Sequence, residues 1–464
     1  MSIIAYLLVI EAASPPSDIP ARLVGAAVTE GKVLATLEEL SDTVGPRPAG
    51  SPGAQAAVEW ALRTFKADGL KAWTEPVLVP VWVRGVETGE VVAAPPALNQ
   101  TLHLTALGNS APTPPNGVTA ELVEVSSLEE LEGLGEAVRG KLVLLQHAMA
   151  EAKGYGEAAR LRTRGPAQAA RQGAVGALVR SLATASLRSA HTGQTSFGAT
   201  PPIPAAAVSV EDALLLHRLR ARGPVTVRLV LGCGPGKPAK AWSANVVAEV
   251  RGREKPDEVV LVSGHLDSWD LGAGAVDDGA GVALAMEALR LISKVGLAPR
   301  RSVRAVLYMN EENGLQGGVA YAQRHAAELP RHVAALEADS GAGRPLGAKL
   351  EAGPGGAELV RRLLSPLSAL GAAQLREGGG GADIEPLRYA GVPVLELWQD
   401  TSRYFDWHHS AADTFDKVVA SELVLSAAAY AVLAWQLADA PERLARPPEP
   451  KEAPWWSASP LPPP

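Results

Sequence analysis

Five short segments in the second half of the chain carry the side chains that could perform chemistry. They contain His265 and Asp267, Asp277 and Asp278, Glu311 and Glu312, Glu337 and Asp339, and finally His408, His409 and Asp413. Imidazole nitrogens and carboxylate oxygens are protein ligands of Zn²⁺ and related divalent ions. Each segment alone also fits a helix cap or a solvated turn, worth about 1 kcal/mol or less. Their recurrence in one region predicts a metal site.

The position of these segments relative to the predicted strands supports that hypothesis. Hydrophobic runs predict strands, and apolar residues at helical spacing predict the helices between them. Strands are expected at residues 245–250, 258–264, 303–309, 332–337 and 392–397, and helices at residues 281–295, 315–327, 357–370 and 419–438. This alternation predicts an α/β fold with a mainly parallel mixed sheet and helices on both faces. Ligands of such sheets bind beyond the carboxyl ends of the strands, where the acid-rich segments fall.

Neighbouring residues within the segments allow a division of roles. Asp267 stands two positions after His265, and a carboxylate can hold the second ring nitrogen of a ligating histidine and fix its tautomer. Glu311 and Glu312 are adjacent, so one could bind a metal ion while the other accepts a proton from metal-activated water. These patterns favour metal-assisted hydrolysis.

Two other chemistries fit the sequence less well. The glycines at 272–274 and 279–281 could suggest a dinucleotide-binding loop, but Asp270, Asp277 and Asp278 crowd the same turn and would repel a pyrophosphate. A serine hydrolase would need Gly-x-Ser-x-Gly at a strand-to-helix turn, and none of the predicted strand ends offers it.

As a set, the motifs resemble those of the two-zinc aminopeptidase family. The matching motifs are Gly264-His-Leu-Asp-Ser268, Asp277-Asp-Gly-Ala-Gly281, Asn310-Glu-Glu-Asn-Gly-Leu-Gln-Gly317, Glu337-Ala-Asp339 and His409-Ser-Ala-Ala-Asp-Thr414. They lie within residues 243–438, and the whole chain is similar to the carboxypeptidase Q-like branch of the family. Residues 45–50, Gly-Pro-Arg-Pro-Ala-Gly, also fit the family's N-terminal motif. The fold implied is that of the zinc exopeptidases, which is phosphorylase/hydrolase-like.

The resemblance implies a pair of zinc ions and assigns their ligands. Asp277 would bridge the two ions. His265 and Asp339 would complete the coordination of one ion, and Glu312 and His409 that of the other. Two Zn²⁺ ions and three carboxylates leave a charge of about +1, which a bridging hydroxide would neutralise.

The resemblance also implies roles around the metal ions. Glu311 would be the general base and acid, and Asp267 would orient His265. His408 could replace its neighbour as a ligand, but the His-Ser-x-x-Asp-Thr register favours His409.

One departure from the family concerns the oxyanion donor. Many members place a tyrosine just before a Ser-Asp-His motif, where it helps to stabilise the oxyanion. The corresponding residues 378–384, Gly-Gly-Gly-Gly-Ala-Asp-Ile, contain neither tyrosine nor histidine. The second zinc ion alone, Tyr404 or His408 are therefore the alternatives for this role.

The implied activity is hydrolysis of a peptide bond near a free N-terminus, by an aminopeptidase or dipeptidase acting on peptides or dipeptides. Two alternatives remain open. A glutaminyl cyclase of the same fold needs only one metal ion, so a stoichiometry of two zinc ions would argue against it. A non-catalytic, receptor-like relative should have lost ligands, whereas none of the five is missing here.

The chain divides into several expected parts. Residues 118–232 resemble a protease-associated domain, because a Gly-Lys strand, a helix, a Gly-Ala strand and an Ile-Pro strand follow in that order. Residues 18–117 and 235–442 are expected to form the catalytic domain around this small inserted α/β or β-rich domain. Residues 1–17 resemble a signal-like leader, and residues 443–464 form a proline-rich arm.

Composition bounds the partners and the compartment. A net charge of −7 without a basic stripe argues against a nucleic-acid partner. The single cysteine, Cys233, excludes an intramolecular disulfide and lies in a Gly/Pro-rich stretch that predicts a linker.

The apolar N-terminal run favours a secreted or periplasmic protein, with the cytoplasm as the alternative. The uncharged run at 423–437 is shorter than the roughly 20 residues that span a bilayer, so a buried core helix and no transmembrane anchor are expected. The sequence is compatible with a homodimer.

Overall fold

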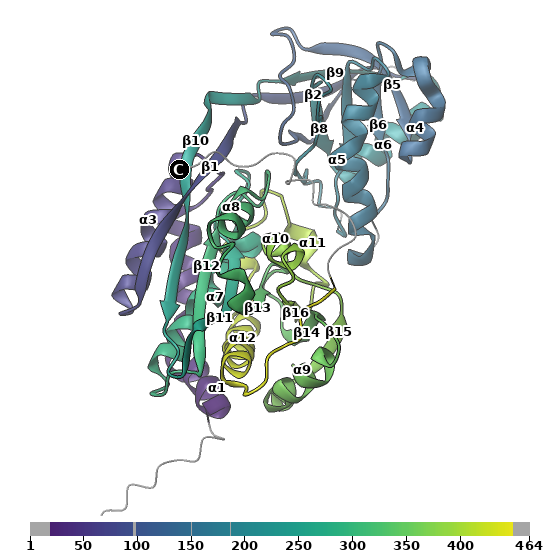
Figure 1. The fold of residues 1–464 in the computed structure, drawn as a ribbon. Coiled ribbons are helices and arrows are strands. Elements are labelled where there is room, and N and C mark those ends of the chain that lie inside the picture. The colour runs from purple at the N-terminus through teal and green to yellow at the C-terminus, as the bar shows by residue number, and fades with distance from the viewer. Residues whose placement is uncertain (1–18, 96–98, 150, 186, 449–464) are drawn as a thin grey trace, which may run out of the picture.

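A mixed eight-stranded sheet forms the larger part of the molecule (Figure 1). The computed structural model describes residues 19–95, 99–149, 151–185 and 187–448. The strands, in spatial order, are β1 (Lys71–Val83), β10 (Gly234–Val250), β12 (Arg301–Tyr308), β11 (Lys255–His265), β13 (His332–Glu337), β16 (Val394–Gln399), β14 (Pro345–Glu351) and β15 (Gln374–Glu377). The central strands β12, β11, β13 and β16 are parallel, whereas β1, β10 and β14 join by antiparallel pairing. The predicted α/β class and mixed sheet are confirmed.

The central strands are hydrophobic throughout because helices cover both faces of the sheet. In β11, Val260 and Val262 pack into the large core on one face, whereas Leu261 between them joins the smaller core on the other. Side chains of a strand alternate between its faces, so a continuous apolar run fills both cores. The parallel centre of the sheet is therefore buried on both sides.

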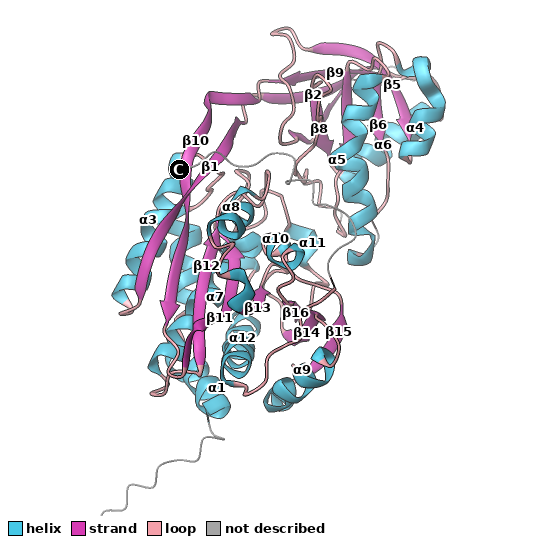
Figure 2. Cartoon of the chain, in the orientation of Figure 1, coloured by secondary structure: helices cyan, strands magenta, loops and turns pink. Residues whose placement is uncertain are grey.

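Two groups of helices provide that cover (Figure 2). The large core includes side chains of α1 (Ile19–Glu30), α2 (Val33–Glu39), α3 (Pro52–Ala67), α7 (Ala280–Lys294), α9 (Gly356–Leu364) and α12 (Ala420–Asp439). The smaller core is covered by α8 (Gln316–Arg324) and α10 (Glu385–Tyr389). The helix α11 (Tyr404–Trp407) lies in the loop after β16. Each predicted helix of this region has an observed counterpart.

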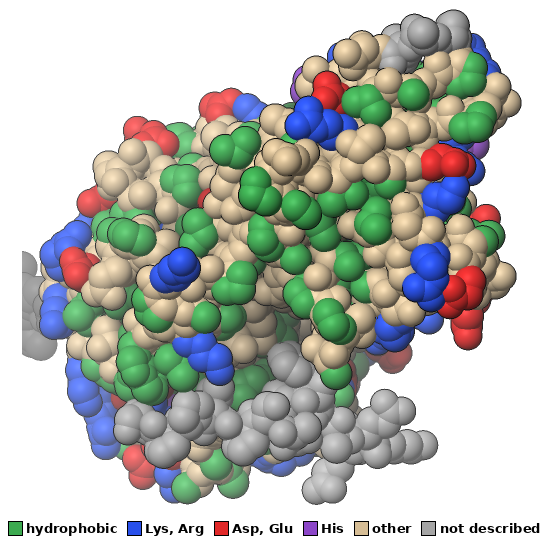
Figure 3. Space-filling model, turned by 90° about the horizontal axis from the view of Figure 1, so that it is seen from above, with side chains coloured by type: hydrophobic (Ala, Val, Ile, Leu, Met, Phe, Trp, Pro, Cys, Tyr) green, Lys and Arg blue, Asp and Glu red, His purple; other side chains and the backbone are tan. Residues whose placement is uncertain are grey.

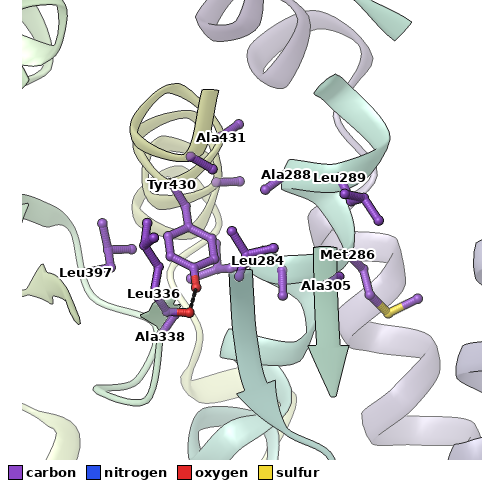
Figure 4. Packing of buried hydrophobic residues seen from close by; sticks show 14 of the residues in the cluster. Leu284, Met286, Ala288, Leu289, Ala305, Leu336, Ala338, Leu397, Tyr430 and Ala431 are labelled. Atoms are coloured by element: carbon purple, nitrogen blue, oxygen red, sulfur yellow. Dashed lines mark hydrogen bonds between the residues drawn. The ribbon is translucent and has the colours of Figure 1, made fainter. Parts of the chain in front are cut away.

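The helix α12 is long and apolar enough to cross a membrane, and 67% of its apolar window is buried inside the protein. It packs against α7 and α1. Its Tyr430 hydroxyl accepts a hydrogen bond from the Ser263 amide (3.1 Å) and donates one to the Leu336 carbonyl (2.9 Å; Figure 4). This packing matches the predicted core helix.

Replacement of Tyr430 by phenylalanine should show how much these hydrogen bonds between α12 and two central strands contribute to stability. The hydroxyl and its buried hydrogen bonds to Ser263 and Leu336 would be lost, so we expect the free energy of unfolding to fall by about 0.5–1.5 kcal/mol. Urea denaturation measures the change. The exposed Ser368, whose hydroxyl bonds only a carbonyl three residues away, is the control. Ser368→Ala should shift stability by less than about 0.5 kcal/mol. Equal effects from both variants would contradict this role.

A second eight-stranded sheet forms a smaller lobe beside the first (Figure 1). Its strands, in spatial order, are β3 (Gln100–Leu102), β2 (Glu87–Ala93), β9 (Thr226–Leu231), β5 (Val118–Val125), β6 (Leu142–Leu145), β7 (Gly176–Arg180), β8 (Ala205–Val208) and β4 (Leu104–Ala106). The helices α4 (Leu128–Leu134), α5 (Tyr155–Arg171) and α6 (Val210–Arg220) pack on it. We refer to this sheet and its helices as the second lobe.

The expected boundary of the inserted domain at residue 118 needs correction. Strand β2 pairs with β9 and strand β4 with β8, so residues from 87 onward already belong to the second sheet. Proline- and glycine-rich residues 109–117 are a loop inside this lobe and not a border. The chain enters and leaves the lobe where Val83 pairs with Gly234, at the ends of β1 and β10.

Cys233 also differs from its predicted setting. It is not in a linker: its side chain is 1% exposed and packs in the core of the second lobe, and burial raises its pKa. In the large sheet, β14 and β15 have no predicted counterpart because both mix polar and apolar residues. The predicted leader at 1–17 and most of the proline-rich arm lie outside the described residues.

Seen from above, the molecule shows charged side chains of both signs scattered among apolar and neutral ones (Figure 3). The densest group of acidic and histidine side chains lies inside the protein, at the carboxyl ends of the central strands.

Candidate metal centre

The parallel strands deliver the predicted site residues to one edge of the large sheet. Strand β11 ends at His265, and the loop after β12 carries Glu311 and Glu312. Asp339 follows the end of β13 by two residues, and the loop beyond β16 carries His409. Because the carboxyl ends of parallel strands meet at one edge, residues more than 100 positions apart come together there.

Asp277 lies at the middle of the group. It sits in the turn Ala275–Gly279 that precedes α7, and its side chain is 4% exposed. One carboxylate oxygen, Oδ1, is 3.1 Å from Nε2 of His265, and the other, Oδ2, is 3.1 Å from Nε2 of His409. Its two oxygens therefore face two different histidines, as a bridging ligand requires.

Each histidine also contacts a second carboxylate. Nε2 of His265 is 3.6 Å from Oδ1 of Asp339, and Nε2 of His409 is 2.9 Å from Oε2 of Glu312. Two ligand atoms of a tetrahedral zinc ion, each about 2.0–2.1 Å from the metal, are roughly 3.3 Å apart. These contacts have about that separation, so the donor set fits two zinc ions, one between His265 and Asp339 and one between His409 and Glu312.

The electrostatics of the group agree with binding of cations. Burial lowers the pKa of His409, but the Glu312 and Asp277 carboxylates outweigh burial and raise it well above the usual value. The same balance, with Asp277 and Asp339 as the partners, raises the pKa of His265. Without metal, protonated imidazoles supply the positive charge that these buried carboxylates need.

Two further carboxylates at the site accept hydrogen bonds from backbone amides. Asp278 accepts hydrogen bonds from the amides of His265 (3.0 Å) and Gly281 (3.0 Å), although it also lies close enough to be a ligand. Glu337 accepts from the amide of Ile384 (3.1 Å). Their oxygens position loops, which leaves Asp277, Asp339 and Glu312 as the carboxylates that face the histidines.

Two residues hold the loop that presents Asp277, and residue spacing alone assigned neither of them a role. The Asp413 carboxylate accepts from the amides of Val276 (2.6 Å) and Asp277 (3.1 Å). Arg47 is fully buried, and its guanidinium donates to the carbonyls of Ala273 (2.6 Å) and Gly274 (2.8 Å). Arg47 lies in the motif at residues 45–50 and Asp413 in the motif at residues 409–414. Their place in motifs that resemble those of the family was the signal that could have pointed to them.

Asp267 acts differently from the sequence-based expectation. The ring of His265 is held at Nδ1 by the backbone carbonyl of Asp267 (3.0 Å) and not by its carboxylate. The carboxylate Oδ1 instead accepts from the amides of Asn310 (2.6 Å) and Glu311 (3.0 Å). Asp267 thus connects the loop of His265 with the loop of Glu311, and a carbonyl fixes the histidine tautomer as well as a carboxylate would.

Glu311 lines the cavity beside the proposed ligands. Burial raises the pKa of its carboxyl well above the usual range, and the nearby carboxylates of Asp339 and Glu312 raise it further. A raised pKa makes the carboxylate a stronger base, which suits a group that takes a proton from water and passes it to a leaving group.

The residues considered for the oxyanion also line this cavity. The ring of His408 stacks on that of His409 with centroids 3.6 Å apart, and Tyr404 lies 5.0 Å from His408. Nε2 of His408 is 3.4 Å from Asp277, a longer separation than that of His409. Burial and the neighbouring His409 lower the pKa of His408 well below the usual value. The structure brings both candidates to the site, and their part in stabilising the oxyanion stays a prediction.

The cavity has a volume of about 760 Å³ and opens between the two lobes. The second lobe contributes Tyr155, Arg162 and Gln194 to its wall, and β14–β16 contribute Lys349, Arg376 and Trp398 on the large sheet. This volume is typical of pockets for small ligands.

Comparisons with known proteins agree with this architecture. Residues 245–434 match the model of Peptidase family M28. The chain is 38% identical to carboxypeptidase Q of Bos taurus over 410 residues, covering 88% of this chain and 85% of that protein. Its structure is similar to that of a Peptidase M28 precursor from Shewanella amazonensis SB2B, with a TM-score of 0.88 and 37% identity over 94% of this chain and 99% of the other.

A more distant likeness concerns the fold alone. An aminopeptidase from Aneurinibacillus sp. strain AM-1 shares 23% identity, with a TM-score of 0.65 over 92% of this chain and 98% of that chain. Similarity to carboxypeptidase Q proteins thus extends over both lobes, and the matched family model spans the strands that carry the candidate metal ligands. The chain therefore belongs to peptidase family M28, in the branch of the carboxypeptidase Q proteins.

Proposed function

We propose that the residues around Asp277 form the zinc site at which this exopeptidase cleaves a peptide bond next to a free N-terminus. Membership of the family makes the chain a zinc metallopeptidase with exopeptidase activity. The assignment of individual residues rests chiefly on one observation: the two oxygens of Asp277 face His265 and His409, each of which contacts one further carboxylate.

In the proposed mechanism, Asp277 would be the shared ligand of two zinc ions, His265 and Asp339 would help to hold one, and Glu312 and His409 the other. When bound, the ions supply Lewis acidity and lower the pKa of water. Glu311 accepts the proton of the attacking water on its carboxylate and donates it to the leaving amine. The backbone that carries Glu311 is held by the Asp267 carboxylate, which accepts from the Glu311 amide (3.0 Å).

The substrate class follows from the enclosure of the site. The ligands are buried at the bottom of a cavity between the lobes, so a long chain running in both directions past the metal ions is disfavoured. An N-terminal residue with a short remainder fits this arrangement. We therefore propose dipeptides and short peptides with a free N-terminus as substrates.

Removal and return of zinc tests this function. A chelator should abolish hydrolysis of L-Ala-L-Ala and L-Ala p-nitroanilide, and activity should return in step with up to two zinc ions per chain, measured by mass spectrometry of the metal. Full activity at one zinc ion per chain would instead support the single-metal alternative. Activity that survives complete removal of zinc would contradict the function.

A further inference from the structure

The positive side chains in the wall of the cavity differ in their partners. Lys153 pairs with Glu151 (2.9 Å), and Lys349 pairs with Glu396 (2.7 Å). These two lysines are neutralised within the protein.

Two arginines of the wall form no ion pair with a carboxylate among the described residues. Arg376 is exposed and lies over the ring of Trp398, with its guanidinium carbon 3.6 Å from the ring centroid. Arg162, from α5 of the second lobe, is only 5% exposed. An exposed guanidinium is solvated by water, whereas a buried one without a counter-ion is costly.

The hydrogen bonds of Arg162 leave its guanidinium incompletely satisfied. Its Nη1 donates to the carbonyl of Thr192 and its Nη2 to the hydroxyl of Tyr155, each at the long distance of 3.3 Å. Its Nε is buried and has no hydrogen-bond partner in the part of the chain that the structure describes. Both partners are neutral and the Tyr155 ring lies 5.8 Å from the guanidinium carbon, so no carboxylate offsets the positive charge among the described residues. A guanidinium has five N–H donors in a planar fork that matches a carboxylate.

This guanidinium lies next to a proposed zinc ligand. The carbonyl oxygen of Thr192 that accepts from Arg162 is also 3.3 Å from Nδ1 of His409. The amide of Thr192 in turn donates to the carbonyl of His409 (2.8 Å). One residue of the second lobe, Thr192, thus connects the arginine with the metal site.

The backbone of the second lobe leaves room for the guanidinium. Gly193 has φ +138°, and a Cβ built there would lie 2.3 Å from the guanidinium carbon of Arg162. Any other residue at position 193 would displace the arginine from the cavity wall or strain the backbone.

We propose that Arg162 binds the free α-carboxylate of a dipeptide whose scissile carbonyl lies at the zinc site. This inference rests on the proposed function and deepens it. One extended residue spans about 3.3–3.6 Å, so only the carboxylate of the residue directly after the scissile bond lies this close to the metal ions. The carboxylate of a longer peptide would lie further out, beyond the reach of Arg162.

The proposal gives the second lobe a part in substrate recognition. The large sheet supplies the metal ligands and the base, whereas α5 of the second lobe supplies the charge that selects for length. The site is incomplete without this helix, and the enzyme is a dipeptidase in preference to a general aminopeptidase.

Arg162→Gln tests the proposal against two matched substrates, L-Ala-L-Ala and its C-terminal amide. We expect kcat/KM for the free dipeptide to fall about 10- to 150-fold, the range for loss of a hydrogen bond to a charged group. The amide, which has no carboxylate, should change less than twofold. The ratio of the two rates is independent of the fraction of folded enzyme. Arg162→Lys, which keeps the charge without the fork, should give an intermediate ratio.

A binding measurement provides a second readout. A dipeptide isostere with a reduced peptide bond, titrated into the zinc-loaded enzyme by calorimetry, should bind more weakly to Arg162→Gln by a similar factor. Its amide should bind equally to both enzymes. Arg164→Gln, on the exposed side of the same helix, is the control and should leave both ratios unchanged.

Two outcomes would overturn the proposal. Equal losses with dipeptide and amide would mean that Arg162 acts on the oxyanion or merely supports His409, and a loss of zinc from Arg162→Gln would mean a structural role. Either result leaves the proposed function standing if the wild-type enzyme cleaves both substrates with zinc. If the wild type cleaves neither, the proposed function fails, while the calorimetric comparison still decides whether Arg162 binds a carboxylate.

Discussion

Replacement of Glu311 by glutamine should lower kcat about 10²- to 10⁴-fold, the usual contribution of a general acid–base group. Glutamine keeps the size of the side chain but has no carboxylate to accept the proton of the attacking water. Because Glu311 is not among the proposed ligands, zinc content should stay at that of the wild type. The expected signature is therefore a nearly inactive enzyme with its full complement of metal, measured by steady-state kinetics and metal analysis of the same sample.

The same change at Glu358 provides the control. Glu358 lies on α9, is highly exposed and has only a long contact with Arg361 (3.6 Å), so Glu358→Gln should behave as the wild type. If Glu311→Gln kept normal turnover, Glu311 would not be the base. If it lost zinc, Glu311 would belong to the ligand set, and the division of roles between the two adjacent glutamates would have to be reversed.

Replacement of Asp277 by asparagine should have the largest effect on metal binding. The asparagine side chain would present one neutral oxygen and an amide nitrogen in place of two anionic oxygens. The two metal ions would therefore lose the charged ligand that they are proposed to share. Loss of an outer partner of a metal ligand costs about 10- to 100-fold in affinity, and loss of the shared ligand itself should cost more. We expect fewer than two zinc ions per chain after desalting and activity that falls with them.

Asp416→Asn is the matched control, because Asp416 is largely exposed and pairs with Lys417 at the surface. It should retain both zinc ions. Asp277→Asn with two firmly bound zinc ions would show that Asp277 does not bridge them. The Glu311 and Asp277 variants are distinguishable: the first should lose turnover and keep metal, and the second should lose metal and turnover together.

Much of the catalytic fold could be predicted because its signals are local. The run from Val259 to Val262 has no polar residue, and only a strand covered on both faces accommodates such a run in an α/β pattern. Strand β13 has its predicted bounds because its interior, from Val333 to Leu336, is likewise apolar. Strands β14 and β15 have no such signal because both mix polar and apolar residues and lie at the partly exposed edge of the sheet.

The second lobe shows the limit of such signals. Short strands such as β3 and β4 contain three residues each, too few for a period-two pattern. Their place is decided by pairing with β2 and β8, and β8 is about 100 residues away from β4 in the sequence. The border of the lobe at residue 87 could therefore not be read from composition, and the proline- and glycine-rich stretch near residue 110 suggested a border too late in the chain.

Residue types and their order along the chain were enough to predict which side chains could bind metal and which strand ends carry them, since both are local properties. How these side chains are used depends on the three-dimensional fold. It turned the Asp267 carboxylate toward two amides, placed Asp413 on the loop of Asp277, and brought Arg162 beside His409. Such contacts join residues whose separation in sequence follows no period, and their distances depend on how two lobes pack.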